Sequence, residues 1–155
     1  MGVTGAGKTT IGRLVAEELG WLFYDADDFH SQANVEKMRR GEPLTDEDRV
    51  AWVESLEQLI RDKVHSGTNI VLACSALKAS YRSHLLIEAQ VRLVYLKGTR
   101  SLIKDRLTER RGHYMNPSLI ESQFAILEEP EQCITVDAAA SPEDTVAAIR
   151  KNLRI

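Results

Sequence analysis

A glycine-rich run near the start of the chain limits its possible folds more than any other feature. This run, Gly2-Val3-Thr4-Gly5-Ala6-Gly7-Lys8-Thr9, matches the pattern G-x-x-x-x-G-K-[ST] at each fixed position. Glycines let the backbone amides of such a loop surround phosphate oxygens, and the N-terminus of the following helix adds further N–H donors. We therefore predict that this run and Thr10 bind the phosphates of a nucleotide. Lys8 would reach the β- and γ-phosphates, and Thr9 would hold Mg²⁺ through its hydroxyl. The alternative is a glycine-rich turn that only precedes a helix.

Helical periods and apolar runs alternate along the rest of the chain. We predict helices over residues 8–19, 32–40, 46–65, 77–87, 101–111, 117–127 and 142–153, and strands over 21–24, 70–74, 91–96 and 134–136. Strands separated by helices imply βαβ units. The expected fold is therefore α/β, with a parallel sheet flanked by helices in three layers, as in P-loop NTPases.

The position of the glycine-rich run raises one expectation about the sheet. Such a loop normally follows a strand, but the run begins at Gly2, one residue after Met1. We expect that the first, central strand is missing from this chain and that the natural start lies upstream of Met1. Loss of that strand would leave two neighbouring strands without a partner.

Composition limits the class of protein. The chain has 155 residues, which fits a single domain over residues 1–155, and a net charge of -3. A nucleic-acid-binding surface normally needs an excess of basic residues, so we expect no nucleic-acid partner. No apolar run is long enough for a membrane span. Two cysteines are too few for a disulfide scaffold, which favours a cytoplasmic protein without a membrane partner.

Two carboxylates follow the strand predicted at residues 21–24. Asp25 and Asp27 lie at its carboxyl end, where α/β sheets bind ligands. One of them could support Mg²⁺ and the other could accept the proton of an attacking hydroxyl. We assign Asp25 to the metal and Asp27 to the hydroxyl, although the two roles could be exchanged. The alternative is an acidic turn that caps a helix.

Other motifs separate a small-molecule kinase from a GTPase switch. The sequence has no N-K-x-D element for reading guanine, and none of its apolar strands ends in D-x-x-G. These absences favour phosphoryl transfer to a small molecule.

Several further strings resemble the gluconate kinase family. They extend from the glycine-rich run to about Asp137 without a large gap. The strings are Asp25-Ala-Asp-Asp-Phe-His30, Asn34-Val-Glu-Lys-Met38, Gly41-Glu-Pro-Leu44, Asp46, Asp48-Arg49, Trp52, Cys74-Ser-Ala-Leu-Lys78, Tyr81-Arg82, Tyr95-Leu-Lys-Gly98, Arg106-Leu107, Arg110, Gly112-His113, Gln123-Phe124 and Leu127-Glu-Glu-Pro130.

This resemblance implies a reaction. ATP, with Mg²⁺, would phosphorylate the 6-hydroxyl of D-gluconate to give 6-phospho-D-gluconate and ADP. It also implies a nucleoside-monophosphate-kinase-like fold, a lid at about residues 104–118 and a possible homodimer.

Cationic and polar residues inside the matching strings are the remaining site candidates. Lys8, Asp27 and Arg106 are the predicted catalytic residues, and Arg106 and Arg110 would also clamp ATP from one helix face. Gluconate has a carboxylate and many hydroxyls, so its site should offer cationic and polar groups. The candidates are Asp27, His30, Arg49, Ser75, Lys78, Arg82 and His113. The alternative for each Arg or Lys is a solvated surface charge.

Two rival functions stay open. One is another P-loop small-molecule kinase of the shikimate or nucleotide type. The other is a catalytically impaired nucleotide-binding module, which the missing strand would favour.

Overall fold

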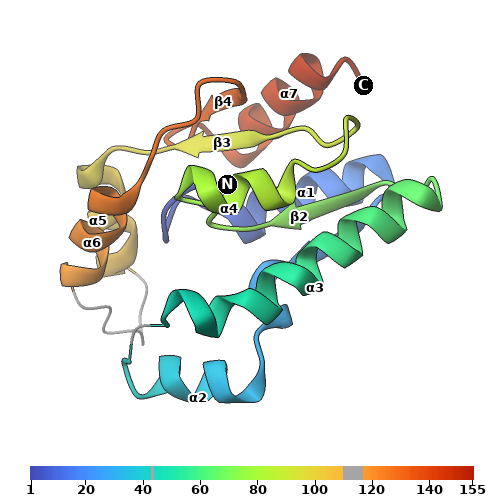
Figure 1. Cartoon of the computed structure of the whole chain (residues 1–155). Coiled ribbons are helices and arrows are strands. Elements are labelled where there is room, and N and C mark those ends of the chain that lie inside the picture. The colour runs from blue at the N-terminus through green and yellow to red at the C-terminus, as the bar shows by residue number, and fades with distance from the viewer. Residues whose placement is uncertain (43, 110–116) are drawn as a thin grey trace.

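A computed structural model describes residues 1–42, 44–109 and 117–155. Helices and short strands alternate along the chain (Figure 1). The elements are α1 (Lys8–Leu19), β1 (Leu22–Asp25), the 3₁₀ helix η1 (Ala26–Phe29), α2 (Gln32–Arg39), α3 (Asp46–His65), β2 (Ile70–Ala73), α4 (Ala79–Leu85), β3 (Val94–Lys97), α5 (Arg100–Glu109), α6 (Pro117–Ile126), β4 (Ile134–Asp137) and α7 (Pro142–Leu153).

The strands form two parallel pairs. β1 pairs with β2, with Leu22 opposite Ile70, and β3 pairs with β4, with Val94 opposite Ile134. Met1 and Gly2 connect the two pairs, because Leu96 N–H donates to the Met1 carbonyl at 2.9 Å and Gly2 N–H donates to the Ser75 carbonyl at 3.2 Å. Within the described residues no strand lies between the pairs. A missing first strand stays a prediction.

Helices cover both faces of the strands and form two apolar cores, which confirms the three-layer α/β fold. On one side, α1 contacts β1, β2 and α7, and α7 contacts β4. On the other side, α3 contacts α4 and η1 (Figure 1). The first core includes Ile11, Leu96, Ile103 and Val146, and the second is built around Leu56.

The loops that follow the strands are anchored in these cores. Val3 and Ala6 of the glycine-rich loop are buried in the first core. Ala26, Cys74 and Ala76, which follow β1 and β2, are buried in the second. Buried small residues therefore alternate with the polar residues of these loops, which fixes the polar residues at one edge of the sheet.

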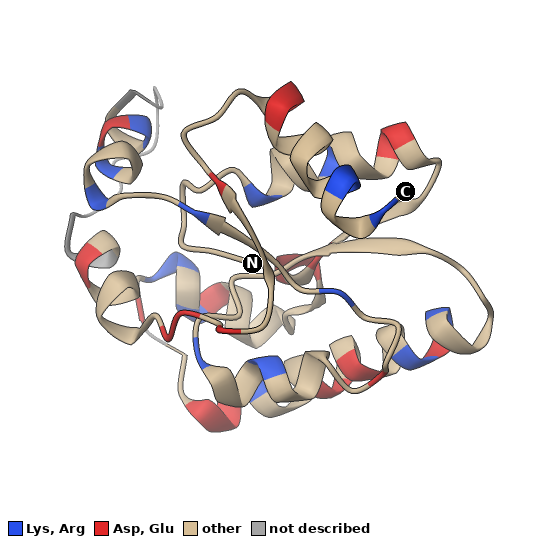
Figure 2. Cartoon of the chain, turned by 90° about the horizontal axis from the view of Figure 1, so that it is seen from above, with Lys and Arg blue, Asp and Glu red and all other residues tan. Residues whose placement is uncertain are grey.

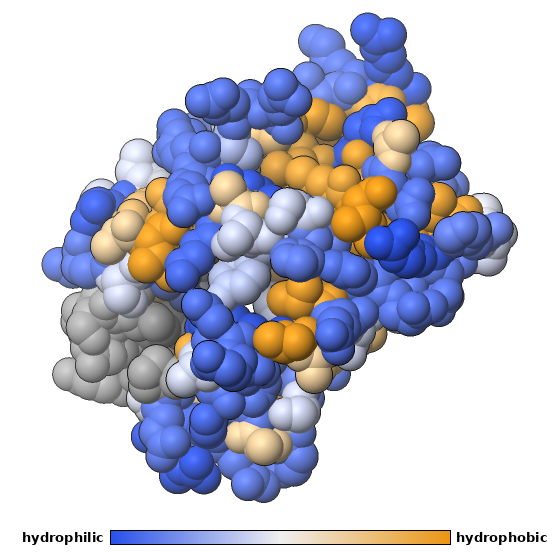
Figure 3. Space-filling model, viewed as in Figure 1, coloured by the Kyte–Doolittle hydropathy of each residue, from blue (hydrophilic) through white to orange (hydrophobic). Residues whose placement is uncertain are grey.

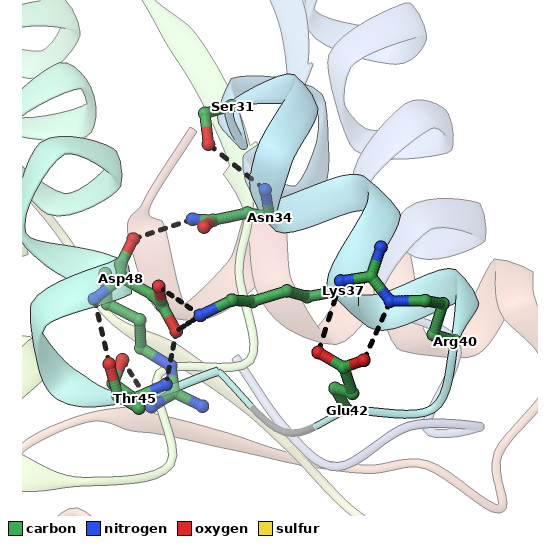
Figure 4. Close-up of polar contacts among 8 residues, drawn as sticks. Ser31, Asn34, Lys37, Arg40, Glu42, Thr45 and Asp48 are labelled. Atoms are coloured by element: carbon green, nitrogen blue, oxygen red, sulfur yellow. Dashed lines mark hydrogen bonds and ion pairs between the residues drawn. The ribbon is translucent and has the colours of Figure 1, made fainter.

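Helix ends follow local sequence signals. Thr45 and Asp48 form a capping box at the start of α3, and Pro142 occupies the first turn of α7 after the cap residue Ser141. Asp48 also forms an ion pair with Lys37 at 2.8 Å, and its carbonyl accepts from buried Asn34 at 2.6 Å (Figure 4). These contacts fasten α2 to the start of α3.

One predicted helix is shorter than expected. The helix predicted over residues 77–87 is reduced to α4, Ala79–Leu85. Ala76 has a positive φ of 46°, which is incompatible with a right-handed helix, and the residues before α4 form a loop instead. This loop, residues 75–78, lines the site described below.

The surface mixes charge and hydropathy. Lys and Arg alternate with Asp and Glu along the helices (Figure 2). Apolar residues form small, separate patches on the face seen in Figure 3. Among the described residues, no helix has both the length and the apolar character that a bilayer span requires.

Candidate active site

The glycine-rich loop closes tightly around the start of α1. Gly5 and Gly7 have φ values of 84° and 96°, which side chains rarely allow. A Cβ on Gly5 would also lie 3.2–3.3 Å from Leu107 and Ile103. The loop can therefore adopt its anion-binding curvature only with glycine at these positions.

A pocket of about 180 Å³ opens on one side of this loop. The end of β1, the end of β2 and the loop meet around it. Its lining residues are Thr4, Gly5, Gly7, Lys8, Thr9, Thr10, Asp25, Asp27, Ala73, Cys74 and Ser75. We call it the phosphate pocket. The structure thus brings together the predicted loop, both aspartates and Ser75.

The two aspartates have different surroundings. Asp25 accepts from the Thr9 hydroxyl at 2.8 Å and from the Asp27 N–H at 3.2 Å. The Asp27 carboxylate has no hydrogen-bond partner among the described residues. Partial desolvation in the pocket, followed by the charge of Asp25, raises the pKa of Asp27 above its ordinary value. Asp27 is thus the carboxylate that is free to accept a proton.

Thr9 and Asp25 form an oxygen pair that suits Mg²⁺. The described residues contain no group of three or more His, Cys, Asp or Glu side chains that could hold a metal. Mg²⁺ beside a nucleotide, however, needs only one or two protein oxygens, because phosphates and water complete its shell. The hydroxyl–carboxylate contact at the mouth of the loop fits this requirement.

His30 lies next to Asp27 and carries an unsatisfied polar atom. Its ring stacks on Trp52, with centroids 4.8 Å apart and planes at 9°. Trp52 is held in turn by its indole N–H, which donates to the Ala26 carbonyl at 2.7 Å. His30 Nδ1 is buried and has no hydrogen-bond partner among the described residues. Burial lowers the pKa of His30, so the ring is neutral at neutral pH and can donate or accept one hydrogen bond.

A cationic group surrounds Tyr81 near His30 and Trp52. The Arg49 guanidinium lies 5.8 Å and the Lys78 ammonium 5.9 Å from the Tyr81 ring centroid. The Tyr81 hydroxyl donates to Asp46 at 2.8 Å, and the same ring meets Trp52 edge-on. Arg49 and Lys78, both predicted from sequence, are therefore brought to one place.

Arg82 occupies a different position from the one predicted. Its side chain is buried, with 7% exposed, and Nη1 donates to the carbonyls of Ala76 and Leu77, each at 3.0 Å. The guanidinium therefore supports the loop 75–78 from beneath and does not reach the pocket. Substrate binding by Arg82 stays a prediction.

Glu128 holds the same loop from the other side. Its N–H donates to the Leu77 carbonyl at 2.9 Å, and its carboxylate accepts from Ala79 N–H, the first residue of α4. The string around Glu128 resembles the family without indicating this role, because a contact between residues 49 positions apart leaves no local pattern.

A second pocket, of about 320 Å³, adjoins the phosphate pocket at the glycine-rich loop, because Gly5, Gly7 and Thr10 line both. The Arg106 guanidinium borders it and donates to the Ala138 carbonyl at 2.6 Å. The other lining residues are Gly5, Ala6, Gly7, Thr10, Ile11, Leu96, Ala138, Ala140, Pro142 and Thr145. This pocket is more apolar than the phosphate pocket, and residues of the glycine-rich loop form part of its wall.

Two predicted site residues, Arg110 and His113, lie outside the described residues, as does the middle of the lid predicted at residues 104–118. Conversely, no role is predicted from the sequence for Tyr81 or Gln123. Both belong to strings that carry the family resemblance, which is the available signal.

Cys74 is buried, which raises the pKa of its thiol to about 11 and makes it unreactive.

Comparisons with known proteins agree with this geometry. The family profile described as shikimate kinase matches residues 4–151. A probable gluconokinase from Mus musculus is 42% identical, and the alignment covers 99% of this chain and 95% of the mouse protein.

Solved structures give the same result. A sugar kinase from Janibacter sp. HTCC2649 is 42% identical with a TM-score of 0.89, covering all of this chain and 92% of that one. A gluconokinase from Sinorhizobium meliloti 1021 is 34% identical with a TM-score of 0.85, covering 99% and 93%. By this identity and coverage, the chain belongs to the gluconokinase family of P-loop kinases, within the wider family that the shikimate kinase profile describes.

Proposed function

We propose that this protein is a gluconokinase that transfers the γ-phosphate of ATP to the 6-hydroxyl of D-gluconate. The observation that carries this proposal is the pair of adjoining pockets that share one phosphate-binding loop. The larger pocket suits a nucleoside. The phosphate pocket combines phosphate-binding groups with the Asp27 carboxylate, which no described residue hydrogen-bonds. Family membership supports the same reaction.

Nucleotide binding rests on the loop and on Arg106. The loop amides and Lys8 would hold the phosphates, and Lys8 would offset charge that develops during transfer. In the structure Lys8 Nζ lies 3.0 Å from the Val3 carbonyl, at the edge of the pocket. Arg106 borders the second pocket, where a guanidinium can contact both the base and the phosphates. Arg110 stays a predicted second clamp.

Mg²⁺ would be held by Thr9, with Asp25 as a direct or water-mediated partner. When bound, it would supply positive charge to the ATP phosphates. The hydrogen bond between Thr9 and Asp25 already places both oxygens on one side of the phosphate pocket.

Asp27 is the proposed proton acceptor for the gluconate hydroxyl. Its raised pKa makes it a stronger base than an ordinary aspartate. Ser75 lines the phosphate pocket and His30 neighbours Asp27, so we assign the Ser75 hydroxyl and His30 Nδ1 to neighbouring hydroxyls of the acceptor. The unsatisfied imidazole nitrogen gains a partner when such a hydroxyl binds.

The gluconate carboxylate is assigned to Arg49 and Lys78, with Tyr81 between them. Arg49 is only partly engaged, because its contacts to Tyr81 and Asp46 are 3.4 and 3.6 Å long. A carboxylate ligand could therefore compete for it with charge-assisted hydrogen bonds. His113 stays a predicted further contact.

Shikimate is the second candidate acceptor, because the matching family profile bears that description. Shikimate also combines a carboxylate with hydroxyls, so the same cationic group could serve it. The named relatives at about 40% identity favour gluconate.

An acceptor panel tests the proposal. Purified protein with MgATP is offered D-gluconate, shikimate or a nucleoside monophosphate, and ADP release is followed in a coupled assay. We expect turnover with gluconate, loss of turnover in Lys8→Ala and full turnover in Lys151→Ala, a matched change on exposed α7. Turnover with shikimate or a nucleotide but not with gluconate would overturn the substrate assignment.

Location and assembly are also proposals. Both cysteines are free thiols, which is typical of a cytoplasmic protein. A homodimer is expected from the family resemblance, and sedimentation analysis would test it.

A further inference from the structure

Gln123 on α6 makes a two-point contact with Thr4 of the glycine-rich loop. The Thr4 N–H donates to Gln123 Oε1 at 2.7 Å, and Gln123 Nε2 donates to the Thr4 hydroxyl oxygen at 2.9 Å. The two residues are 119 positions apart in the sequence, and both are half-buried. The contact therefore joins α6 to the loop at a single residue.

Chemistry fixes the orientation of this contact. A backbone N–H can only donate, so the amide oxygen of Gln123 must face it. The amide NH₂ must then face the Thr4 hydroxyl, whose oxygen accepts this bond. The hydroxyl proton of Thr4 is consequently directed away from Gln123, and no described residue accepts it. Thr4 also lines the phosphate pocket beside Lys8 and Thr9.

We propose that Gln123 is a positioning residue that makes the Thr4 hydroxyl a hydrogen-bond donor to an oxygen of the transferred phosphoryl group. This inference rests on the proposed phosphoryl transfer and does not depend on the identity of the acceptor molecule. Because Gln123 already occupies the Thr4 N–H, the hydroxyl is the only group of Thr4 that can donate to a phosphate. Gln123 itself touches no reactant.

The phosphoryl group is the occupant that the pocket chemistry favours. Lys8 and the loop amides lie on the same wall as Thr4, and all of them attract anionic oxygens. A donor fixed in advance costs no reorganisation during transfer, and removal of one such donor commonly lowers kcat by about 100-fold or more.

Gln123→Glu gives the sharpest test, because it keeps the shape of the side chain. The introduced carboxylate can still accept from the Thr4 N–H, but its second oxygen is also an acceptor, so the Thr4 hydroxyl must turn and donate to that oxygen. Thr4→Val removes the hydroxyl at nearly constant shape, and Thr4→Ser retains it. Gln132→Glu is the matched control, since exposed Gln132 precedes β4 at the opposite edge of the sheet.

In a double-mutant cycle, we expect the losses of kcat from the two substitutions not to add. Gln123→Glu and Thr4→Val each lower kcat by about 100-fold or more at little-changed KM for gluconate. When Gln123→Glu is added to Thr4→Val, kcat falls by less than about twofold relative to Thr4→Val alone. Thr4→Ser keeps the hydroxyl and should lower kcat less than Thr4→Val does, and Gln132→Glu stays within about threefold of the parent chain. If Gln123→Glu lowered kcat equally in the parent chain and in Thr4→Val, the cause would be simple charge repulsion and the proposal would be overturned. A parent-like kcat in Gln123→Glu would also overturn it.

A binding measurement separates this inference from the choice of substrate. Calorimetry with Mg²⁺ compares a non-hydrolysable ATP analogue, which has a γ-phosphate, with ADP, which has none. Gln123→Glu and Thr4→Val should weaken analogue binding several-fold more than ADP binding, even if gluconate is not the acceptor. Equal weakening for both nucleotides would contradict a contact to the γ-phosphoryl group.

Discussion

Asp27 is the residue whose chemistry the surrounding structure changes most directly. The pocket and the neighbouring Asp25 charge raise its pKa, and in the described part of the chain its carboxylate has no hydrogen-bond partner. A base in this state is deprotonated above its folded pKa and protonated below it. We therefore predict that kcat/KM for gluconate falls as pH decreases through a value above that of an ordinary aspartate, 3.8.

Asp27→Asn should lower activity while it raises stability at pH 7. The change removes the base and lowers kcat by about 100-fold or more, with ATP affinity retained. Because the folded pKa is raised, ionised Asp27 destabilises the fold, and this penalty grows as pH rises through the folded pKa. Chemical denaturation should thus find Asp27→Asn more stable than the parent at pH 7, with a smaller difference at pH 3. Lower stability at pH 7 would show that Asp27 supports the fold.

At the residue scale, sequence spacing could indicate the carboxylate pair but not the orientation of each side chain. Asp25 and Asp27 follow a strand, so their location could be predicted. Their separate tasks depend on which one Thr9 reaches, which is a three-dimensional fact. Tyr81 and Arg82 are adjacent on α4, but Arg82 is buried and bonds the loop 75–78, whereas the Tyr81 hydroxyl donates to Asp46. Their adjacency in sequence does not indicate which of the two is buried.

The loop between β2 and α4 is the element on which acceptor binding depends. Arg82, Glu128 and Gly2 hold it through its carbonyls and the first N–H of α4. Ala76 keeps a positive φ of 46° within it, a conformation that costs energy for a residue with a Cβ. These contacts offset that cost and fix Ser75 and Lys78 on the pocket side.

Arg82→Met tests this role. Methionine fills similar volume but leaves the Ala76 carbonyl without its donor, while the Leu77 carbonyl keeps the Glu128 N–H, so the free energy of unfolding should fall by about 1–3 kcal/mol. The KM for gluconate should rise more than the KM for ATP, because the acceptor loop loosens while the glycine-rich loop does not. Urea denaturation and steady-state kinetics measure the two effects, and exposed Arg13→Met on α1 is the control. An equal rise of both KM values would argue against a local role.

At the element scale, sequence signals sufficed where the cause was local. The helices α1, α3 and α7 have the predicted bounds because Gly20, the Thr45–Asp48 box and Pro142 act within one turn. The start of α4 could not be predicted, since Arg82 and Glu128 impose the loop through tertiary contacts. The division of the strands into two pairs likewise depends on contacts between distant segments.

The whole molecule places one nucleotide-binding loop between two apolar cores. Val3 and Ala6 are buried in the first core, and Ala26 and Cys74, across the phosphate pocket, are buried in the second. Nucleotide binding should therefore stabilise the domain as a unit. An ATP analogue at 100 times its Kd should raise the free energy of unfolding by about 2.7 kcal/mol.

Thermal unfolding with and without the analogue and Mg²⁺ measures this effect. Lys8→Ala should lose most of the shift, whereas Lys151→Ala should keep it. A full shift in Lys8→Ala would mean that the nucleotide binds away from the glycine-rich loop.

The central claim is that this loop and the aspartates beside it move a phosphoryl group onto gluconate. Phosphorus NMR of a mixture of protein, MgATP and D-gluconate tests it most directly, because it identifies the product. We expect ADP and 6-phosphogluconate in equal amounts, with the new phosphate on the terminal hydroxyl, and neither product with Lys8→Ala. ATP consumed only to ADP and inorganic phosphate, or gluconate left unchanged by protein that binds ATP, would contradict it.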